Sequence, residues 1–373
     1  MKKFTILIAA LALVCFSVPA MADWSFYGSA RMQTFWTDTD LGDTPLANGD
    51  DDDNDLRWDF QTNSRLGANV KADAVSGRIE LGLKGTDGGD LDVGTRRAYG
   101  TWDFGAGKLK VGKDYTPLDQ FISGQVFDED WGLVGQGFMY ARRPGQVALS
   151  FGGFEVALIT PRSDTIATAA VGAGAAGGSF NGGDIDEYLP KIEASYGMAF
   201  DAFNFAIRGG AQTYKVEDVV SLVDGSTNDI DVTSYAIGAD AGFNFGPAYI
   251  GGAVSYTVNG GNASWLAGAA TFDGDDDVED VNTIQAGLVG KLKVSDMLTF
   301  EVGGGWRQDD PDDAPSARDE KTTTWAVYGQ SVIALAPGVY LIPEIGYYDK
   351  GDSAADVDQG DLWYAGAKWQ IDF

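Results

Sequence analysis

The C-terminal segment, residues 361–373, alternates strictly between apolar and polar side chains. This period of two predicts a β-strand with one apolar and one polar face. A strand at a chain end is an exposed edge unless it has a partner on both sides, and a closed barrel provides both partners by pairing the last strand with the first. Two tryptophans and a terminal phenylalanine on the apolar face favour lipid over water as its surroundings. The apolar positions are Trp363, Ala365, Ala367, Trp369, Ile371 and Phe373.

The N-terminal residues 1–22 have the pattern of a secretory signal peptide. Lys2 and Lys3 precede a short apolar run, and Ala20-Met21-Ala22 forms an Ala-x-Ala cleavage site. The run is too short for a transmembrane helix. A lipoprotein anchored at Cys15 is disfavoured because the residues before it make a poor lipobox. Cleavage after Ala22 removes the chain's one cysteine, so the mature protein, residues 23–373, is predicted to fold without a disulfide.

The charge of the chain excludes some classes of partner and of chemistry. Loss of Lys2 and Lys3 changes the net charge from −29 to −31, which repels nucleic acid and anionic membrane surfaces. With no histidine and no mature cysteine, Ser–His and Cys–His hydrolase mechanisms are excluded. A site built from carboxylates alone stays open, but no pair of acids is singled out. We expect neither an enzyme nor a cofactor.

The same alternation continues along the chain after Asp23. Short Gly/Asp/Asn connections follow one end of the alternating segments, and longer polar segments follow the other end, as in outer-membrane barrels. About sixteen such segments can be counted, and merging or splitting segments in the glycine-rich middle would give fourteen or eighteen. Many aromatic residues fall near the segment ends, where membrane interfaces favour them. The sequence predicts an all-β protein: one transmembrane antiparallel barrel in the bacterial outer membrane.

One connection, residues 116–137, differs from the other loops because it is both apolar and acidic. An external loop with this much apolar surface would be costly in water. We therefore expect it to fold into the barrel, with its apolar side against the wall and its acids toward the lumen. The acids are Asp119, Asp128, Glu129 and Asp130.

Basic residues are concentrated around this loop. Once Lys2 and Lys3 are removed from the total of 26, residues 24–143 hold 13 of the 24 lysines and arginines. An arginine on the lipid face near the midplane would cost about 2–4 kcal/mol, so the lumen is the expected side. A basic wall opposite an acidic loop would create a transverse field that favours polar solutes and biases ion flow. Strand parity places on this wall Arg31, Arg57, Arg65, Arg78 and Arg97.

A family resemblance rests on three features: the segment Gly112-Lys113-Asp114-Tyr115, the long loop after it, and the C-terminal Phe373. Together they resemble general diffusion porins of Gram-negative bacteria, especially the acidic porins of sulfate-reducing bacteria. The resemblance implies a homotrimer in the outer membrane, in contact with lipid and lipopolysaccharide, whose C-terminal strand is read by the outer-membrane assembly machinery. The small residues Gly28 and Ala30 of the first strand would suit an intersubunit wall.

The resemblance also implies roles for single residues. Ser64-Arg65-Leu66-Gly67 resembles the segment that carries a constriction arginine, which assigns that role to Arg65. Lys113 would supply another base if the strand ends there. Ser29 and Gln136 stand where some family members carry a base. The predicted constriction comprises Arg31, Arg65, Arg97, Lys113, Asp119, Asp128, Glu129 and Asp130.

The predicted ion preference follows from two competing charge effects. The acidic mouths attract cations at low salt, but exposed charges are screened beyond about 8 Å at physiological salt. Basic groups at the constriction act at shorter range and favour anions. We expect a weak cation preference at low salt that shrinks as salt rises, and neutral residues in place of Arg65 and Lys113 should strengthen it.

Alternative functions and sites remain at this stage. A substrate-selective channel could use a track of lumenal tyrosines, and a non-conducting structural or anchoring barrel would need a plugged lumen or an extra domain. The motif 172–177 fits GxGxxG but lies in an Ala/Gly-rich loop without the strand and helix that a dinucleotide site needs. The acidic runs Asp50–Asp53 and Asp273–Asp277 could bind Ca²⁺ weakly, or are solvated loop acids. The candidate track comprises Tyr27, Tyr99, Tyr340, Tyr348 and Tyr364.

Overall fold

The computed structural model describes residues 22–43, 52–84, 92–163, 167–168, 184–220, 227–272, 278–312, 321–353 and 355–373. The predicted signal peptide falls outside these residues apart from Ala22. So do the glycine motif at 172–177 and the acidic run Asp273–Asp277. Among the described residues, no helix is long and apolar enough to cross a membrane.

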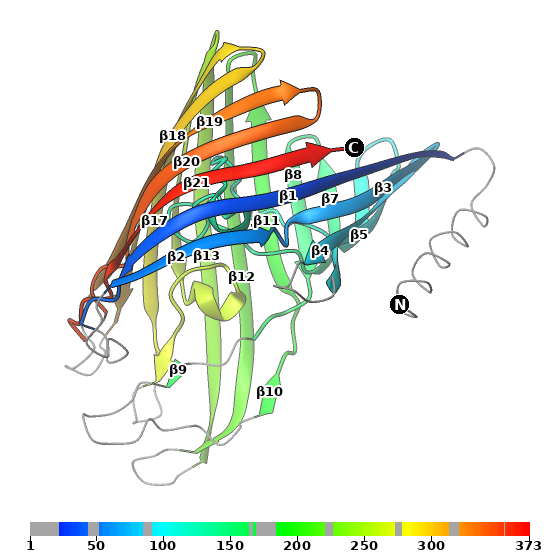
Figure 1. Ribbon diagram of the computed structural model, residues 1–373. Coiled ribbons are helices and arrows are strands. Elements are labelled where there is room, and N and C mark those ends of the chain that lie inside the picture. The colour runs from blue at the N-terminus through cyan, green and yellow to red at the C-terminus, as the bar shows by residue number, and fades with distance from the viewer. Residues whose placement is uncertain are drawn as a thin grey trace.

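Sixteen antiparallel strands form one closed barrel, which confirms the predicted architecture and strand number. Each strand pairs with its neighbour along the chain, and β21 pairs with β1 to close the wall (Figure 1). The first eight strands of the wall are β1 (Asp23–Asp40), β3 (Ser64–Ala72), β4 (Val75–Lys84), β5 (Asp92–Asp103), β6 (Lys108–Lys113), β7 (Gly145–Phe151), β8 (Phe154–Ile159) and β11 (Lys191–Ala199). The other eight are β12 (Phe203–Val220), β13 (Thr227–Phe245), β14 (Ala248–Val258), β17 (Val281–Ser295), β18 (Leu298–Pro311), β19 (Thr322–Ala336), β20 (Val339–Asp349) and β21 (Asp361–Asp372).

Shorter elements extend or cap this wall. Strand β2 (Asp52–Phe60) pairs with the C-terminal half of β1, next to the stretch that pairs with β3. In the same way, β10 (Asp184–Asp186) continues β11 along β12. A small separate sheet joins β15 (Thr271–Phe272) to β16 (Val278–Glu279) and β9 (Ala167–Thr168). Two short helical turns complete the set, α2 (Phe127–Asp130) and η1 (Gly260–Ala263).

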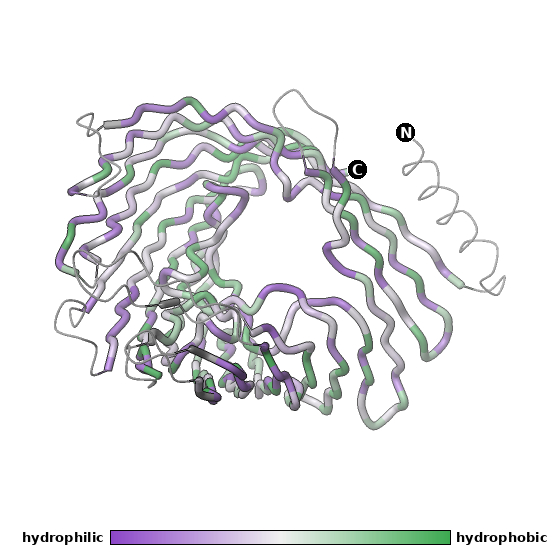
Figure 2. Tube along the Cα trace, turned by 90° about the horizontal axis from the view of Figure 1, so that it is seen from below, coloured by the Kyte–Doolittle hydropathy of each residue, from purple (hydrophilic) through white to green (hydrophobic). Residues whose placement is uncertain are grey.

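The pairing of the chain ends is the one that the terminal alternation predicts. Ser29 of β1 lies opposite Asp372 of β21, and the backbone groups of Gly28 and Phe373 exchange two hydrogen bonds of 2.6 and 3.0 Å. Figure 2 shows hydrophilic and hydrophobic residues alternating along the strands. Large apolar side chains such as Leu288 and Val302 are more than half exposed on the outer face, where a membrane barrel meets lipid.

The segment 56–71, which alternates between apolar and polar residues over most of its length, is interrupted in the structure. Residues 61–63 form a break between β2 and β3. As a result, β2 pairs with the C-terminal half of β1 and β3 pairs with its N-terminal half. The polar residues Thr62 and Asn63 are thereby free of the β-ladder. Both take part in holding the long loop described next.

The loop between β6 and β7, residues 114–144, folds into the barrel, as expected for 116–137. Its apolar side chains pack against the inner wall: Leu133 and Phe138 contact Val289 and Tyr328, and Phe127 stacks on Tyr364 with ring centroids 3.8 Å apart. The loop therefore supplies much of the hydrophobic core of the barrel. Without the loop, the wall would enclose only water.

Three buried glutamates of the wall hold the backbone of this loop. Glu193 on β11 accepts from the N–H of Leu118 (3.3 Å), and Glu301 on β18 accepts from the N–H of Gly124 (2.6 Å). Glu344 on β20 accepts from two successive N–H groups of the loop, at 2.7 and 3.1 Å. Hydrogen bonds to a charged acceptor contribute about 1.5–3 kcal/mol each, so these carboxylates fix the path of the loop around the wall.

We predict that Leu288→Arg lowers the free energy of unfolding by about 2–4 kcal/mol, because Leu288 lies midway along the outward apolar positions of β17. Val294→Arg, at the turn end of the same strand, should cost only about 0–1 kcal/mol. Denaturant unfolding of the barrel in lipid vesicles measures both. Equal losses would mean that this face of β17 does not cross the membrane.

We also predict that Glu344→Ala loosens the loop without unfolding the barrel. The substitution leaves the N–H groups of Val126 and Phe127 and the hydroxyl of Tyr364 without their acceptor, at about 1–3 kcal/mol for each buried group. Hydrogen exchange at residues 124–127 should become faster. The matched control is Glu155→Ala, because Glu155 pairs with Lys110 on the wall (3.1 Å); exchange that rises equally in both variants would contradict the assigned role.

Candidate functional site

A group of basic side chains lies on the inner face of β3, β4, β5 and β6. Its centre is the buried Glu80 of β4. The Glu80 carboxylate lies 2.6 Å from Arg78, 3.1 Å from Arg96 and 3.9 Å from Arg65, and it accepts a hydrogen bond from the Tyr27 hydroxyl (2.8 Å). Three guanidinium groups around one carboxylate leave a net positive charge. The basic wall comprises Arg65, Arg78, Arg96, Arg97 and Lys110.

A β-bulge explains why two neighbouring arginines both belong to this wall. Glu80 lies opposite Arg97 and Leu81 lies opposite Thr95, so Arg96 is the extra residue of β5. A bulge breaks the alternation of faces and re-aims one side chain. Arg96 therefore reaches Glu80 while Arg97 pairs with Asp114 at 2.6 Å. Parity along β5 predicts Arg97 on the inner face and misses Arg96, because nothing in the sequence marks the bulge.

Gly112 resolves the question of where Lys113 points. Its φ of +131° is a conformation that side chains rarely adopt, and a Cβ there would overlap the carbonyl oxygen of Ala98. The alternation of β6 ends at this glycine. Lys113 consequently lines a cavity at the outer end of the basic wall.

This outer cavity of about 600 Å³ is strongly basic. Trp131 and Tyr140 of the loop line it as well, and among the described residues around it none is an aspartate or glutamate. The guanidinium groups of Arg143 and Arg97 lie 5.3 and 5.1 Å from the centroid of the Tyr115 ring. The basic residues of the cavity are Lys84, Arg96, Lys113, Arg142, Arg143 and Arg162.

The tip of the loop is a left-handed turn held by ion pairs. Asp128, Glu129 and Asp130 have φ values of +50°, +67° and +60°, each of which costs about 1–2 kcal/mol for a residue with a side chain. Asp130 pairs with Arg31 and with Lys368, the latter at 2.7 Å.

The other two acids of the tip have separate partners. Glu129 accepts from the Thr62 hydroxyl (2.8 Å) and from the backbone of Asn63 (3.2 Å), both at the break between β2 and β3. Asp128 is more exposed and lies 3.3 Å from Arg57. The interrupted strand is thus the docking point of the tip.

Asp119 lies at the root of the loop and takes no part in the lumen's charge pattern. Its carboxyl accepts from the backbone N–H groups of Thr116 (2.9 Å) and Ala141 (2.6 Å), which ties the two ends of the loop together. Burial raises the pKa of Asp119 to about 8, although these two hydrogen bonds act in the opposite direction.

Of the eight residues predicted for the constriction, the structure joins Arg31 and Asp130 in a direct ion pair. Arg65 and Arg97 pair instead with acids of the wall and of the loop's start, Glu80 and Asp114. The acids of the loop are used in docking its tip and closing its root. The side of the loop around the lumen carries an aromatic cluster of Tyr115, Phe121 and Tyr140, with ring centroids 4.8–6.4 Å apart.

The predicted track of tyrosines is divided. Tyr348 and Tyr364 are covered by the loop and pack on Phe127. Tyr27 and Tyr99 belong to the basic wall, where Tyr99 lies 5.3 Å beneath the Arg97 guanidinium. The described residues contain no cluster of three or more acidic, histidine or cysteine side chains that could hold a metal ion. Of the acidic run Asp50–Asp53, only Asp52 and Asp53 are described, in β2.

Comparisons with solved structures agree on the fold. The outer-membrane channel DcaP of Acinetobacter baumannii is 18% identical over 95% of this chain and 99% of its own, with a TM-score of 0.68. OmpT of Vibrio cholerae in its trimer form is 17% identical over 94% and 99%, with a TM-score of 0.58. The anion-selective porin from Comamonas acidovorans is 16% identical over 94% and 100%, with a TM-score of 0.56. No curated protein sequence matches this chain.

A family model for Gram-negative porins matches residues 9–353. The fold and the family are those of a channel rather than of an enzyme, and they place the barrel in the bacterial outer membrane. The narrower resemblance to porins of sulfate-reducing bacteria stays a prediction. The chain belongs to the Gram-negative porin family, and it forms an outer-membrane channel for the passive diffusion of small solutes.

Proposed function

We propose that solutes cross the channel between the basic wall and the aromatic edge of the loop, and that this path favours small hydrophilic anions. The observation that carries the proposal is the placement of charge. Asp128, Glu129 and Asp130 of the loop tip are bound at their docking site, whereas the outer cavity is lined by six bases and, among the described residues, by no aspartate or glutamate. The bases of β3–β6 outnumber their acidic partners Glu80, Asp114 and Glu155.

The anchors of the loop define this path. Hydrogen bonds and ion pairs attach the loop to the wall at Glu193 on β11, at Glu301 on β18, at Glu344 on β20 and at Arg31 on β1. The anchored arc thus runs from β11 through β21 to the start of the wall. The remaining strands, β3–β8, carry the basic side chains and the two ends of the loop, whose Asp114 pairs with Arg97 and Lys110.

The net charge of the chain acts against this preference in a way that depends on salt. Many of the acids belong to the long polar segments of the sequence between the strands, and the field of exposed charges is screened within about 8–10 Å at physiological salt. The bases of the wall act on a solute at a few ångströms. We therefore expect anion preference at high salt and a shift toward cations as salt is lowered.

Arg96→Gln combined with Arg143→Gln should shift the permeability ratio toward cations. One charge at about 7 Å in water contributes about 0.6 kcal/mol, or about a factor of three, and the double variant removes two such charges. Reversal potentials across planar bilayers under a KCl gradient, at low and high mean salt, measure the shift. Glu80 keeps Arg78 and Tyr27 as partners in this variant, so the wall should stay folded.

The matched control is Lys293→Gln, because Lys293 pairs with Asp296 in an exposed turn at the other end of the barrel. It should leave the ratio unchanged. If both variants behave like the unmodified channel at every salt concentration, the path lies elsewhere in the lumen. A substrate-selective channel, the alternative, would show saturable current block by one class of solute.

We further propose that the barrel assembles as a homotrimer, for which the trimer form of OmpT gives the analogy. On the outer face the ring of Phe373 occupies the space above Gly28, so this glycine makes room for the terminal residue. Phe26 and Phe373 remain 62% and 70% exposed beside it, which gives one apolar patch at the seam of the barrel. Native mass measurement in mild detergent should give three copies, and a monomer at all concentrations would contradict the assignment.

The remaining proposals concern the export of the chain and the partners of the barrel. We propose that cleavage after Ala22 releases residues 23–373 for export. The outer face would contact lipid and lipopolysaccharide, and the C-terminal strand would be read by the outer-membrane assembly machinery. Weak Ca²⁺ binding by the acidic runs remains part of this proposal.

A further inference from the structure

A second segment folds into the barrel, although its composition is that of an exposed loop. Residues 259–270, between β14 and β15, are largely buried, with Asn259, Asn262 and Trp265 fully so. Inward-facing polar side chains of the wall hold this segment. Ser234 donates to the Asn259 carbonyl (2.7 Å), Gln285 donates to the Leu266 carbonyl (3.0 Å), and Thr283 accepts from the Gly268 N–H (2.9 Å).

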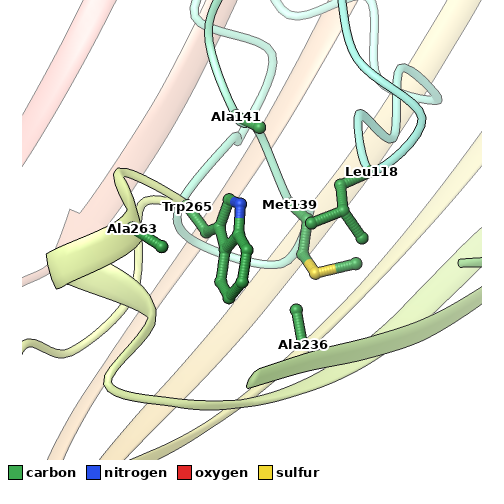
Figure 3. Close-up of a cluster of buried hydrophobic side chains, with 6 residues drawn as sticks. All are labelled: Leu118, Met139, Ala141, Ala236, Ala263 and Trp265. Atoms are coloured by element: carbon green, nitrogen blue, oxygen red, sulfur yellow. The ribbon is translucent and has the colours of Figure 1, made fainter. Parts of the chain in front are cut away.

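This inner segment packs directly against the long loop. The Trp265 ring lies among Leu118, Met139 and Ala141 of the loop (Figure 3). Its indole N–H donates to Glu193 at 2.9 Å, and the other oxygen of that carboxylate accepts from the loop's Leu118 N–H. One wall glutamate therefore binds both elements at once.

A buried lysine completes the link between the two elements. The Lys191 ammonium donates to the Ala263 carbonyl at 3.0 Å and lies 3.4 Å from Glu193. It also lies 5.6 Å from the Trp265 ring centroid, within the range of a cation–π contact. The inner segment is thus tied to the wall and to the long loop through the same pair of charges.

The residue after Trp265, Leu266, lies at the boundary between two cavities. Leu266 and Trp131 both line the basic cavity described above, and both also line a second cavity of about 460 Å³. The second cavity has mixed charge, with Arg57, Asp128 and Arg307 among its lining residues. Two side chains from two different loops therefore border both the basic cavity and the mixed one.

Leu266 is held in this place at a cost in backbone energy. Its φ of +48° is a genuine outlier for a bulky residue and costs about 1–2 kcal/mol. Strain of this size persists only where the surroundings impose it. The Gln285 hydrogen bond to its carbonyl and the buried Trp265 beside it supply that constraint.

We propose that Leu266 and Trp131 form a second constriction that sets the size limit of the channel above the basic wall, and that Trp265 is the positioning residue that holds Leu266 there. This inference rests on the channel function but not on anion preference. The second constriction determines which sizes of solute pass, whereas the basic wall determines which charges pass. The two proposals can therefore fail separately.

The test changes the side chain at the boundary in both directions. Leu266→Ala should raise single-channel conductance and shift the exclusion limit for neutral polyethylene glycols to larger sizes, whereas Leu266→Trp should lower both. Trp131→Ala should act like Leu266→Ala. Reversal potentials should be unchanged by the Leu266 variants, since no charge is altered.

The positioning role has its own readout. Trp265→Phe keeps an aromatic ring, smaller than the indole, but loses the N–H bond to Glu193, so its conductance should stay closer to that of the unmodified channel than the conductance of Trp265→Ala. Trp265→Ala should give conductance close to that of Leu266→Ala, together with larger current fluctuations. Leu335→Ala, on the exposed outer face, serves as the control for loss of the same side chain outside the lumen.

Heat-dependent migration in detergent gels shows that each variant is folded. Folded variants of Leu266 with unchanged conductance and an unchanged exclusion limit would overturn the proposal. A change in permeability ratio without a change in size limit would also overturn it, because it would make Leu266 part of the charge filter.

Discussion

The pore of this barrel depends on hydrogen bonds between buried wall carboxylates and the backbone of a loop. A loop that enters a barrel carries N–H groups away from water, and each needs an acceptor. Glu193, Glu301 and Glu344 supply these acceptors from three separate strands. Their spacing around the wall makes the loop follow an arc instead of hanging free in the lumen. The open space is then whatever part of the wall lacks such anchors.

This arrangement explains how a chain of strongly negative charge can have a basic region on its inner wall. The wall glutamates are buried under the loop, and the acids of the loop tip are bound to Arg31, Lys368 and the break after β2. Acids that hold structure are withdrawn from the lumen. The bases around Glu80 outnumber their one buried partner, so this part of the inner wall keeps a local positive charge that the net charge does not reveal.

The barrel could be predicted from sequence because its rule is periodic. Period two, short turns alternating with long loops, and the terminal aromatic are all local patterns, and strand number and closure follow from them. The site follows no such rule. Arg96 enters the lumen through a bulge that no residue type announces, and Lys113 does so because Gly112 takes a positive φ. The wall glutamates leave a faint signal, since each is a lone acid between two apolar residues within a strand, as in Phe300-Glu301-Val302.

The burial of the inner segment 259–270 could not be predicted from the sequence, for a different reason. Its glycines, asparagines and alanines have the composition of an exposed loop, and only the partners that it meets in the lumen bury it. Backbone strain gives independent evidence that the surrounding residues impose the conformation of this segment. Of the eleven non-glycine residues with positive φ in the described chain, eight lie in the two segments that enter the barrel, at 114–144 and 259–270. At about 1–3 kcal/mol each, such conformations persist only where contacts over-determine them. The strain is thus concentrated where the chain must turn within the width of a barrel, and the wall's buried polar groups are what hold it there.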